Sequence, residues 1–449
     1  MVADVVSNAT DSASHFSIPN LVFENRTRLD ATQFDTVDQH GSSFHVVAVK
    51  AAYQLGACDA KGIAALSPIV GATLNIEDRY FDDDQDTGVR QESDFAPYKP
   101  ACDVIVNATA HAPGGQPATE FQVRLSVYKL KHPNNTASAA PLIDKHLDIG
   151  GERSFQKKCA LWRLLQWAGL CATFGLVKPN PWRSSVPHGV TSVPLRYTFA
   201  NGGQCRIDEG GTSLYESSEE NPVGRGFARR WYLDAKPGKS FAAPQISALG
   251  GPLTALQFWH TANGAALPAP VGMGVVGRGW LPRRLLTGTF ENKVEWGEDE
   301  VPRLPMDFDF AWYNCAPRDQ QCPYLGGRET FSLMNLCNVR HPSATHDIKG
   351  NTLLRFSLPL DQLFLMAVDG DSKLMFQRLV IDTVVIEPDE NRVDVVWRTL
   401  LATDIDLRVA RLMQISEPEQ IARLDHVLQG QEALSQAASA DSQLAGAAQ

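Results

Sequence analysis

Residues 119–130, which read TEFQVRLSVYKL, decide the fold class of this chain. Apolar side chains alternate along this stretch with polar or amphipathic ones, and the apolar set is Phe121, Val123, Leu125 and Val127. Alternation with a period of two is typical of a half-buried antiparallel strand, because successive side chains of a strand point to opposite faces. The stretch therefore predicts a sheet that covers a core with one face.

The segments on either side of this strand continue the same pattern. Residues 102–116, CDVIVNATAHAPGGQ, predict a strand followed by a Pro-Gly-Gly turn. Residues 142–155 predict a further hairpin with a turn at 150–151, and the β-branched run 44–51 follows a turn signal at 38–41. Five or six strands joined by short connections, with no helix between them, predict a β-sandwich or a curled sheet.

The C-terminal part of the chain returns to antiparallel strands. Residues 353–416 contain long apolar runs, with hairpin turns predicted at 369–371 and 388–391. Residues 417–434 are the clearest candidate for a helix, which begins at a Glu-Pro pair. We therefore expect a mainly β protein of antiparallel β-sandwich-like units, with long loops rich in Gly, Pro and aromatic residues, few helices and a C-terminal helix.

The composition changes along the chain predict five parts. These are a flexible tail at 1–15, a β-rich N-terminal unit at 16–156, a loop-rich central part at 157–329 with one short helix, C-terminal antiparallel strands at 330–416, and a helix with a disordered tail at 417–449.

Charge and composition exclude several classes of function. Lys and Arg number 41 against 51 Asp and Glu, a net charge of −10, and a nucleic-acid partner requires a basic face. The first residues lack the basic start and apolar run of a secretory signal, and no apolar run approaches the ~20 residues that span a bilayer. A cytoplasmic protein with no membrane span is expected. The eight cysteines form no C-x-x-C pair, so buried free thiols, no metal and no cofactor are expected.

Residues 272–329 differ from the rest of the chain. Gly and Pro recur every few residues and exclude a long helix, while three tryptophans and several Phe and Tyr residues are costly to leave in water. Loops and short strands packed on a rigid scaffold are typical of a binding surface or an enzyme site. A structural plug, in which the aromatic side chains fill the core, is the alternative.

Asp307 and Asp309 are the best pair of carboxylates in this stretch. At a spacing of two on a strand they would share one face, and two acids can serve as general acid and base in glycoside cleavage. The alternative is a structural acid pair that binds backbone amides or nearby arginines, which are Arg283, Arg284, Arg303 and Arg318. The sequence contains neither clustered histidines nor a G-x-S-x-G nucleophile elbow, so no known catalytic motif supports an enzyme.

Residues 77–99 form an acidic segment. Its aspartates Asp82, Asp83, Asp84 and Asp86 resemble half of a calcium-binding loop, and Gly88 follows them. The flanking helices of such a loop are not predicted, which favours a solvated acidic loop over a cation site.

Several short motifs occur in order along residues 20–335. They are Asp94 with Pro97–Val104, Gly151–Arg153, Asn221–Phe227, Trp280–Arg283 with Gly288–Phe290, and Leu304–Asp309 with Ala316–Gln321. In this order and spacing the chain resembles the domain-of-unknown-function proteins that are encoded beside bacterial type VI secretion genes and are treated as effector adaptors. One segment departs from the family pattern, because Arg196–Gly203 contains extra residues where the family has Arg-Ala-Phe-Gly-Gly.

This resemblance implies a cytoplasmic adaptor or chaperone that loads an effector toxin onto the spike or the spike-tip protein. It supplies no catalytic residues. Aromatic and arginine side chains dominate binding hot spots, so the candidate contacts are Arg225, Trp280, Arg283, Arg284, Trp296 and Trp312. The alternatives are that these residues hold the scaffold together, that the protein is a carboxylate-dependent hydrolase, or that it is a structural part of the secretion apparatus.

Overall fold

The structure is a computed structural model of the 449-residue chain. It describes residues 21–83, 88–129, 140–159, 161, 164, 169, 180–209, 212–218, 221–235, 240–248, 250–289, 296–297, 300–403, 406–417 and 419–429.

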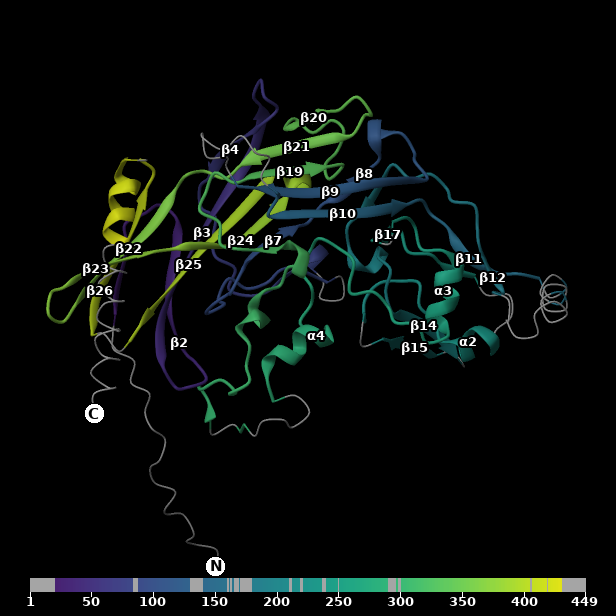
Figure 1. The fold of residues 1–449 in the computed structure, drawn as a ribbon, viewed down its shortest axis with the longest axis horizontal. Coiled ribbons are helices and arrows are strands. Elements are labelled where there is room, and N and C mark those ends of the chain that lie inside the picture. Colours follow the sequence, from purple (N-terminus) through teal and green to yellow (C-terminus); the bar gives the residue numbers. More distant parts are fainter. Residues whose placement is uncertain are drawn as a thin grey trace, which may run out of the picture.

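A curled sheet of 13 strands forms the body of the protein (Figure 1). Most neighbouring strands are antiparallel, whereas β24 pairs with β7, and β21 with β4, in parallel. Along the sheet the order is β17 (Ile246–Ser247), β10 (Ile143–Gly150), β9 (Glu120–Tyr128), β19 (Thr330–Met334), β21 (Thr352–Ser357), β4 (Ala64–Ile69), β3 (Ser43–Cys58), β25 (Arg392–Ala402), β24 (Val380–Glu387), β7 (Cys102–Val106) and β18 (Gln321–Cys322), while β2 (Asp30–Val37) pairs with β3 and β20 (Ala344–His346) with β21.

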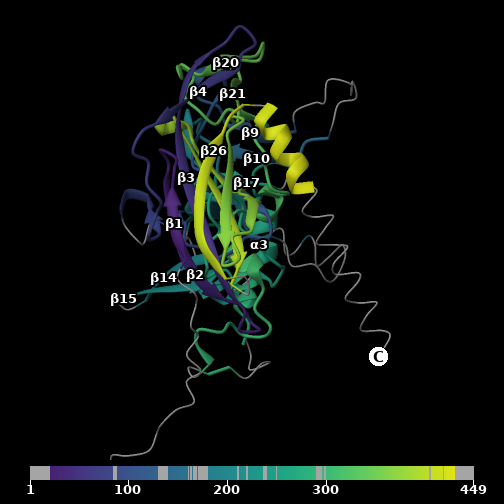
Figure 2. The same cartoon turned by 90° about the vertical axis from the view of Figure 1, so that its left-hand side faces the viewer.

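A second sheet of four strands packs on the first. Its order is β1 (Val22–Asn25), β26 (Leu407–Ile415), β22 (Gln362–Asp369) and β23 (Leu374–Arg378). Side chains of β22 and β26 belong to the same hydrophobic core as those of the large sheet. The two sheets therefore form a sandwich-like unit, and the C-terminal helix at 419–429 lies beside the four-stranded sheet (Figure 1 and Figure 2).

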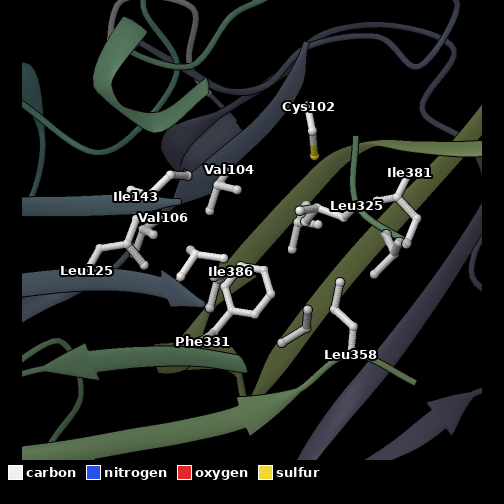
Figure 3. Close-up of a cluster of buried hydrophobic side chains, with 14 of the residues drawn as sticks. Cys102, Val104, Val106, Leu125, Ile143, Leu325, Phe331, Leu358, Ile381 and Ile386 are labelled. Atoms are coloured by element: carbon white, nitrogen blue, oxygen red, sulfur yellow. The ribbon is translucent and has the colours of Figure 1, made fainter. Parts of the chain in front are cut away.

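The main core lies inside the curl of the large sheet. Val104 and Val106 of β7 face Leu125 of β9 and Ile143 of β10, so the curl brings distant strands of the sheet together (Figure 3). Phe331 of β19 stacks on its cross-strand neighbour Phe356, with ring centroids 5.0 Å apart. Aromatic cross-strand pairs of this kind stabilise sheet register.

A smaller core lies in the part drawn in teal at the right of Figure 1. It joins α2 (Arg230–Ala235) and α3 (Ala255–Ala262) to a sheet of β12 (Trp182–Ser184), β11 (Ser154–Lys157) and β16 (Ser240–Ala242). Phe155 stacks on Phe258 at 4.5 Å. Thr254 is the N-cap residue of α3 and forms a capping box with Gln257, which satisfies two backbone amides at the start of the helix.

Short elements connect these layers. They are α4 (Leu281–Arg284), the strand pairs β13 (Ser192–Pro194) with β8 (Thr109–His111), β14 (Gln204–Glu209) with β15 (Thr212–Ser217) and β5 (Arg79–Tyr80) with β6 (Val89–Gln91), and the 3₁₀ turns η1 (Phe81–Asp83), η3 (Pro113–Gly115), η4 (Tyr197–Phe199), η5 (Leu285–Thr287), η8 (Phe310–Tyr313), η9 (Arg318–Gln320) and η10 (Pro388–Glu390).

The predicted fold class is confirmed: the protein is mainly β, with few helices and a C-terminal helix. The strand predicted from 119–130 is β9, and its four apolar side chains are buried. Strands of the predicted N-terminal unit pair directly with strands from 330–416, as β3 does with β25. The short helix predicted within residues 157–182 has Leu161, Leu164, Leu165 and Ala168 on one face. Leu161 and Leu164 are helical and exposed, and most other residues of this stretch lie outside the described part.

Candidate functional site

Two arginines anchor residues 276–284 to the acidic segment that precedes β7. The buried Arg283 forms two parallel hydrogen bonds to the carboxylate of Glu92, at 2.6 and 2.8 Å. Arg278 pairs with Asp78 at 2.8 Å and also reaches Glu92 at 3.4 Å. Bidentate arginine–carboxylate pairs fix orientation as well as distance, so these contacts hold the 276–284 backbone in one position.

α4 begins within this anchored segment for local reasons. Trp280 is its N-cap residue, with extended backbone, and Pro282 lies in the first turn, where an amide hydrogen has no helical partner. The amide of Arg283 donates to the Trp280 carbonyl at 3.0 Å, and Nη1 of Arg283 donates to the Val276 carbonyl at 2.6 Å. The same turn therefore fixes Trp280 and Arg283 relative to one another.

A partly exposed aromatic cluster lies against these arginines and consists of Tyr98, Phe308, Phe310, Trp312 and Tyr313. The guanidinium of Arg278 lies 5.4 Å, and that of Arg283 5.8 Å, from the centre of the Trp312 ring. The Trp312 carbonyl also accepts a 2.9 Å hydrogen bond from Nε of Arg283. Cation–π contacts and this hydrogen bond hold the cluster against the segment that carries α4.

An apolar pocket of about 370 Å³ lies at the N-terminal end of α4. Its first wall is formed by residues from 274–280, its second by residues from 195–198 and 222–224 with Pro270, and its third by Phe81, Gly88 and Val89. Arg196 is the charged side chain among these lining residues, and its guanidinium is paired with Asp82 at 2.6 Å. The pocket can therefore accept an apolar side chain without leaving a charge unpaired.

Two glycines allow the second wall of the apolar pocket to form. The amide of Gly202 donates to the Arg225 carbonyl, and that of Arg225 to the Ala200 carbonyl, both at 2.7 Å. A Cβ atom on Gly202 would lie 1.5 Å from the Val223 oxygen, which no side chain tolerates. Gly224 has φ +93° and a Cβ there would lie 2.5 Å from the Ala200 oxygen. Glycine is required at both positions, so Gly224 of the 221–227 motif has a structural role: it allows this segment to pack against residues 200–202.

Three of the predicted contact residues lie at or near this pocket. Trp280 lines it. Arg225 is exposed, follows the lining residue Gly224, and places its guanidinium 5.0 Å from the centre of the Phe199 ring. Arg284 is exposed in the last turn of α4.

The other three predicted contacts have different surroundings. Arg283 is buried and has the scaffold role that was the alternative expectation for it. Trp312 is half-buried beneath two guanidiniums. Trp296 is exposed and its Nε1 donates to the Arg303 carbonyl at 3.0 Å. Of the six predicted contact residues, Arg283 is therefore buried inside the protein, and the other five are at least partly exposed.

The acid pair does not lie on a strand, so that expectation is wrong. Pro305 begins a turn, in which the amide of Phe308 donates to the Pro305 carbonyl at 3.0 Å. Asp309 then caps η8 by accepting a hydrogen bond from the Ala311 amide at 2.8 Å. Asp307 accepts from the Thr289 amide at 3.0 Å.

Neither carboxylate of the acid pair has the surroundings expected of a catalytic group. Both side chains are exposed, and neither lines the 370, 200 or 10 Å³ pockets. The arginine expected to pair with them, Arg283, binds Glu92 instead. Asp309 thus satisfies a backbone amide of its own turn, and Asp307 satisfies the amide of Thr289, which follows η5.

The 97–103 motif packs inside the protein. Nζ of Lys99 donates to Asp103 and to the hydroxyl of Thr383, both at 2.9 Å. Asp103 also accepts from the side chain of Asn314 and the amide of Cys315, both at 3.0 Å. Burial acts to lower the pKa of Lys99, but nearby charges, of which Asp103 is the strongest and Asp382 another, together outweigh it and hold that pKa above its ordinary value. The motif therefore joins β7 and β24 to the loop that follows the aromatic cluster.

Sequence reasoning missed the partners of this buried charge network. Lys50 of β3 pairs with Asp94 at 2.9 Å, and Arg398 of β25 pairs with Asp382 of β24 at 2.6 Å. All four side chains are buried. Lys50, Asp382 and Arg398 are each a charged residue in a strand whose sequence is mainly apolar. This pattern predicts that a charged side chain is buried with a partner of opposite charge.

The acidic segment gives no metal site in the described residues. Asp82 pairs with Arg196, which lowers the pKa of its carboxyl. Among the residues that the structure describes, no group of three or more His, Cys, Asp or Glu side chains could hold a metal ion. Asp84 and Asp86, which belong to the predicted half of a calcium loop, lie outside the described residues.

Sequence reasoning also missed most of the pocket lining. Tyr197 donates its hydroxyl hydrogen to the Gly274 carbonyl at 2.9 Å, and burial raises the pKa of this phenol. Val223 and Val275 supply apolar surface from two different walls. Nothing in the sequence around these residues predicts that they line a pocket. The glycines that recur near them indicate only that two backbone segments approach closely.

Residues 40–398 match the model of a known protein family, described as "Uncharacterized protein conserved in bacteria (DUF2169)". The chain belongs to the DUF2169 family. The DUF2169 match covers all three walls of the apolar pocket and ends within β25. The expected membership of a bacterial family of unknown function is thereby confirmed.

Neither the curated proteins nor the solved structures that were searched contain a significant match to this DUF2169 protein. In the part of the chain that the structure describes, no helix has the length and apolar character needed to cross a membrane.

Proposed function

We propose that this protein is a non-catalytic adaptor or chaperone that binds a type VI secretion effector and helps to load it onto the spike or the spike-tip protein. The observation that carries the proposal is the apolar pocket, because its walls contain residues of the Asn221–Phe227 and Trp280–Arg283 motifs on which the resemblance to effector adaptors rests. Apolar pockets bordered by aromatic and arginine side chains are the usual anchor points of binding surfaces.

The surroundings of the pocket suit a preformed binding surface. Arg283 and Glu92 fix the segment that carries Trp280 before any partner arrives. A surface that is already ordered avoids the entropy cost of ordering side chains and loops on binding. Arg225 and Arg284 are exposed near the same segment and can contact acidic groups of a partner.

The hydrolase alternative gains no support from the described residues. Hydrolysis by two carboxylates requires both groups to flank one bound glycosidic bond, at a separation set by the mechanism. Asp309 instead caps η8, and Asp307 accepts a hydrogen bond from the Thr289 amide; both side chains are exposed. We therefore do not assign them a catalytic role.

The proposal is tested by a tagged pull-down from cells that express the secretion genes, with bound proteins identified by mass spectrometry. Recovery of one dominant toxin, alone or with a spike-tip protein, supports the adaptor. Recovery only with complete assembled spikes supports a structural component instead. Recovery of none of these proteins overturns the proposal.

Matched variants connect the pull-down to the surface. We expect Arg225→Glu and Arg284→Glu to reduce capture of the effector at least tenfold with unchanged melting temperature. Arg340→Glu, the same charge reversal at an exposed arginine that is neither next to a lining residue of the pocket nor part of α4, is the control and should capture normally. Normal capture by both the Arg225 and the Arg284 variant would remove these arginines from the contact surface.

A further inference from the structure

We propose that Cys102 and Cys322 form a site of oxidative modification, at which a hydroperoxide such as hydrogen peroxide converts the two thiols into a disulfide bond. The inference does not depend on the proposed adaptor function. It follows from three properties of the pair: its register in the large sheet, the shared surroundings of the two sulfur atoms, and the position of Cys322 on a short edge strand.

The two cysteines lie directly opposite one another in the large sheet. β18 pairs antiparallel with β7, and the register places Cys322 opposite Cys102 and Gln321 opposite Asp103. Residues that face each other across an antiparallel pair have Cα atoms about 4.5–5.5 Å apart and side chains on the same face. Disulfide bonds form at Cα separations of about 4.4–6.8 Å. The backbone therefore holds this pair at a separation that suits a disulfide bond.

The two thiols share one buried, apolar environment. Cys102 is 0% and Cys322 is 4% exposed, and both belong to the main hydrophobic core, in which Figure 3 shows the Cys102 side chain. Burial raises the pKa of the Cys102 thiol well above its ordinary value, and the interaction with the Cys322 thiol is the next largest cause. The second effect requires the two thiols to be neighbours. A disulfide bond between them is itself apolar, so the surrounding core accommodates it.

Cys322 is the thiol that an oxidant reaches first. β18 consists of Gln321 and Cys322 and lies at the end of the large sheet, whereas β7 lies between β18 and β24. Short segments at the edge of a structure open locally at a lower free-energy cost than central strands. Oxidation should therefore begin at Cys322 and should take hours, because it must wait for β18 to open.

The reaction consumes one molecule of hydrogen peroxide for each pair of thiols. When β18 opens, the Cys322 thiol loses its proton and its sulfur attacks a peroxide oxygen. The O–O bond breaks, which leaves a sulfenic acid on Cys322 and a hydroxide that takes up the proton to become water. The Cys102 sulfur then attacks the sulfenic sulfur, so that the S–S bond forms, the S–O bond breaks, and the departing hydroxide takes the Cys102 proton as a second water. The thiols lose two electrons, and the peroxide gains them.

The disulfide bond fastens a segment that connects two parts of the structure. Gln320 directly precedes β18, and its Nε2 donates to the Val104 carbonyl of β7 at 2.7 Å and to the Met273 carbonyl at 2.9 Å. Met273 precedes Gly274, which belongs to the first wall of the apolar pocket. A covalent bond at Cys322 limits the opening of β18, and with it the separation of Gln320 from both carbonyls. Oxidation should therefore make the connection between β7 and the first wall more rigid.

The test exposes the folded Cys159→Ser protein to millimolar hydrogen peroxide overnight. This background removes an exposed thiol that would otherwise link two molecules. Peptide mass spectrometry without reduction should find the peptide that contains Cys102 joined to the peptide that contains Cys322, and dithiothreitol should separate them again. Cys315→Ala, at a buried cysteine outside β7 and β18, should form the same crosslink in a yield within twofold. If the two peptides stay unlinked, or if either cysteine joins only to a different one, the proposal is overturned.

Hydrogen exchange measures the effect of the bond on the segment. We expect the amides of residues 320–325 to exchange at least tenfold more slowly after oxidation of the Cys159→Ser protein, because the opening of β18 is restricted. The same peroxide treatment of a protein that also carries Cys322→Ala should leave their exchange within twofold of the untreated value. Equal exchange in the oxidised and reduced Cys159→Ser protein would show that the bond does not fasten β18.

Discussion

Arg283 and Glu92 are 191 residues apart in the sequence and form two hydrogen bonds in a buried position, at 2.6 and 2.8 Å. The pair joins the segment that carries Trp280 to the acidic segment before β7. Both residues lie in or beside the short motifs that occur in order along residues 20–335, so part of the motif pattern reflects a structural requirement. The pair also leads to the first prediction.

Arg283→Ala should lower the free energy of unfolding by about 3–5 kcal/mol, because it leaves the carboxylate of Glu92 buried without its main partner. Equilibrium unfolding in urea measures the change. Arg124→Ala, at a partly exposed pair with Asp144, is the control and should cost no more than about 1 kcal/mol. A similar cost for both variants would show that the Arg283 pair is not an anchor.

Gly202→Ala should destabilise the protein by about 3 kcal/mol, since the added methyl group overlaps the Val223 carbonyl and forces the second wall of the pocket apart. Thermal unfolding by circular dichroism reports the loss. Gly279→Ala, where the added methyl group meets open space, should change the free energy of unfolding by less than about 0.5 kcal/mol. Equal stability of the two variants would contradict the packing role of Gly202.

Stability should fall on acidification partly through Glu387. Burial acts to raise the pKa of Glu387, but hydrogen bonds and charge from Arg90 with a hydrogen bond from Asn107 outweigh it and lower that pKa. A lowered pKa in the folded state contributes stability above the unfolded value, about 4.3, and the contribution is lost as the pH falls through the folded value.

The test compares the wild-type protein with Glu387→Gln by urea unfolding between pH 3 and pH 7. We expect the variant to be less stable at pH 7, with a difference that shrinks as the pH falls below about 4.3. Glu419→Gln, at an exposed position of the C-terminal helix, should show no such trend. A constant difference across the range would contradict the role of Glu387 ionisation.

Thiol reactivity should follow burial. Cys159 is exposed, whereas Cys102, Cys315, Cys322 and Cys337 are buried, and burial raises the pKa of the Cys337 thiol to about 12 and that of the Cys315 thiol still further. Reaction with N-ethylmaleimide at pH 7.5, followed by peptide mass spectrometry, should label Cys159 within minutes and the buried four only in denaturant. Rapid labelling of Cys315 in the folded protein would contradict its place in the core.

Periodicity predicted the parts of the fold that depend on local pattern. β9 follows from the alternation of Phe121, Val123 and Leu125, and the turn at 388–391 follows from its Pro-Asp-Glu-Asn sequence, with Asn391 in the left-handed conformation. These features are set by side-chain spacing and by the backbone preferences of a few residues. They do not require knowledge of distant contacts.

Contacts between distant segments could not be predicted. Arg283 had several carboxylates within reach in sequence, yet it binds Glu92, because the fold places Asp78 and Glu92 beside Arg278 and Arg283. Asp307 and Asp309 have strand-like spacing, but the preceding Pro305 begins a turn. Asp309 satisfies an amide of η8, and Asp307 satisfies the amide of Thr289. The pocket was missed because its walls come from three segments whose residues carry no shared pattern.

The pairing of β3 with β25 has a consequence for synthesis of the protein. Val49 lies opposite Trp397, so the middle of the large sheet combines strands from near the two ends of the folded chain. The ribosome must therefore release almost the entire polypeptide before these strands can meet. Until then β3 can pair with β2 and β4, but the side that β25 will cover has no partner strand. Topologies dominated by such distant contacts fold slowly.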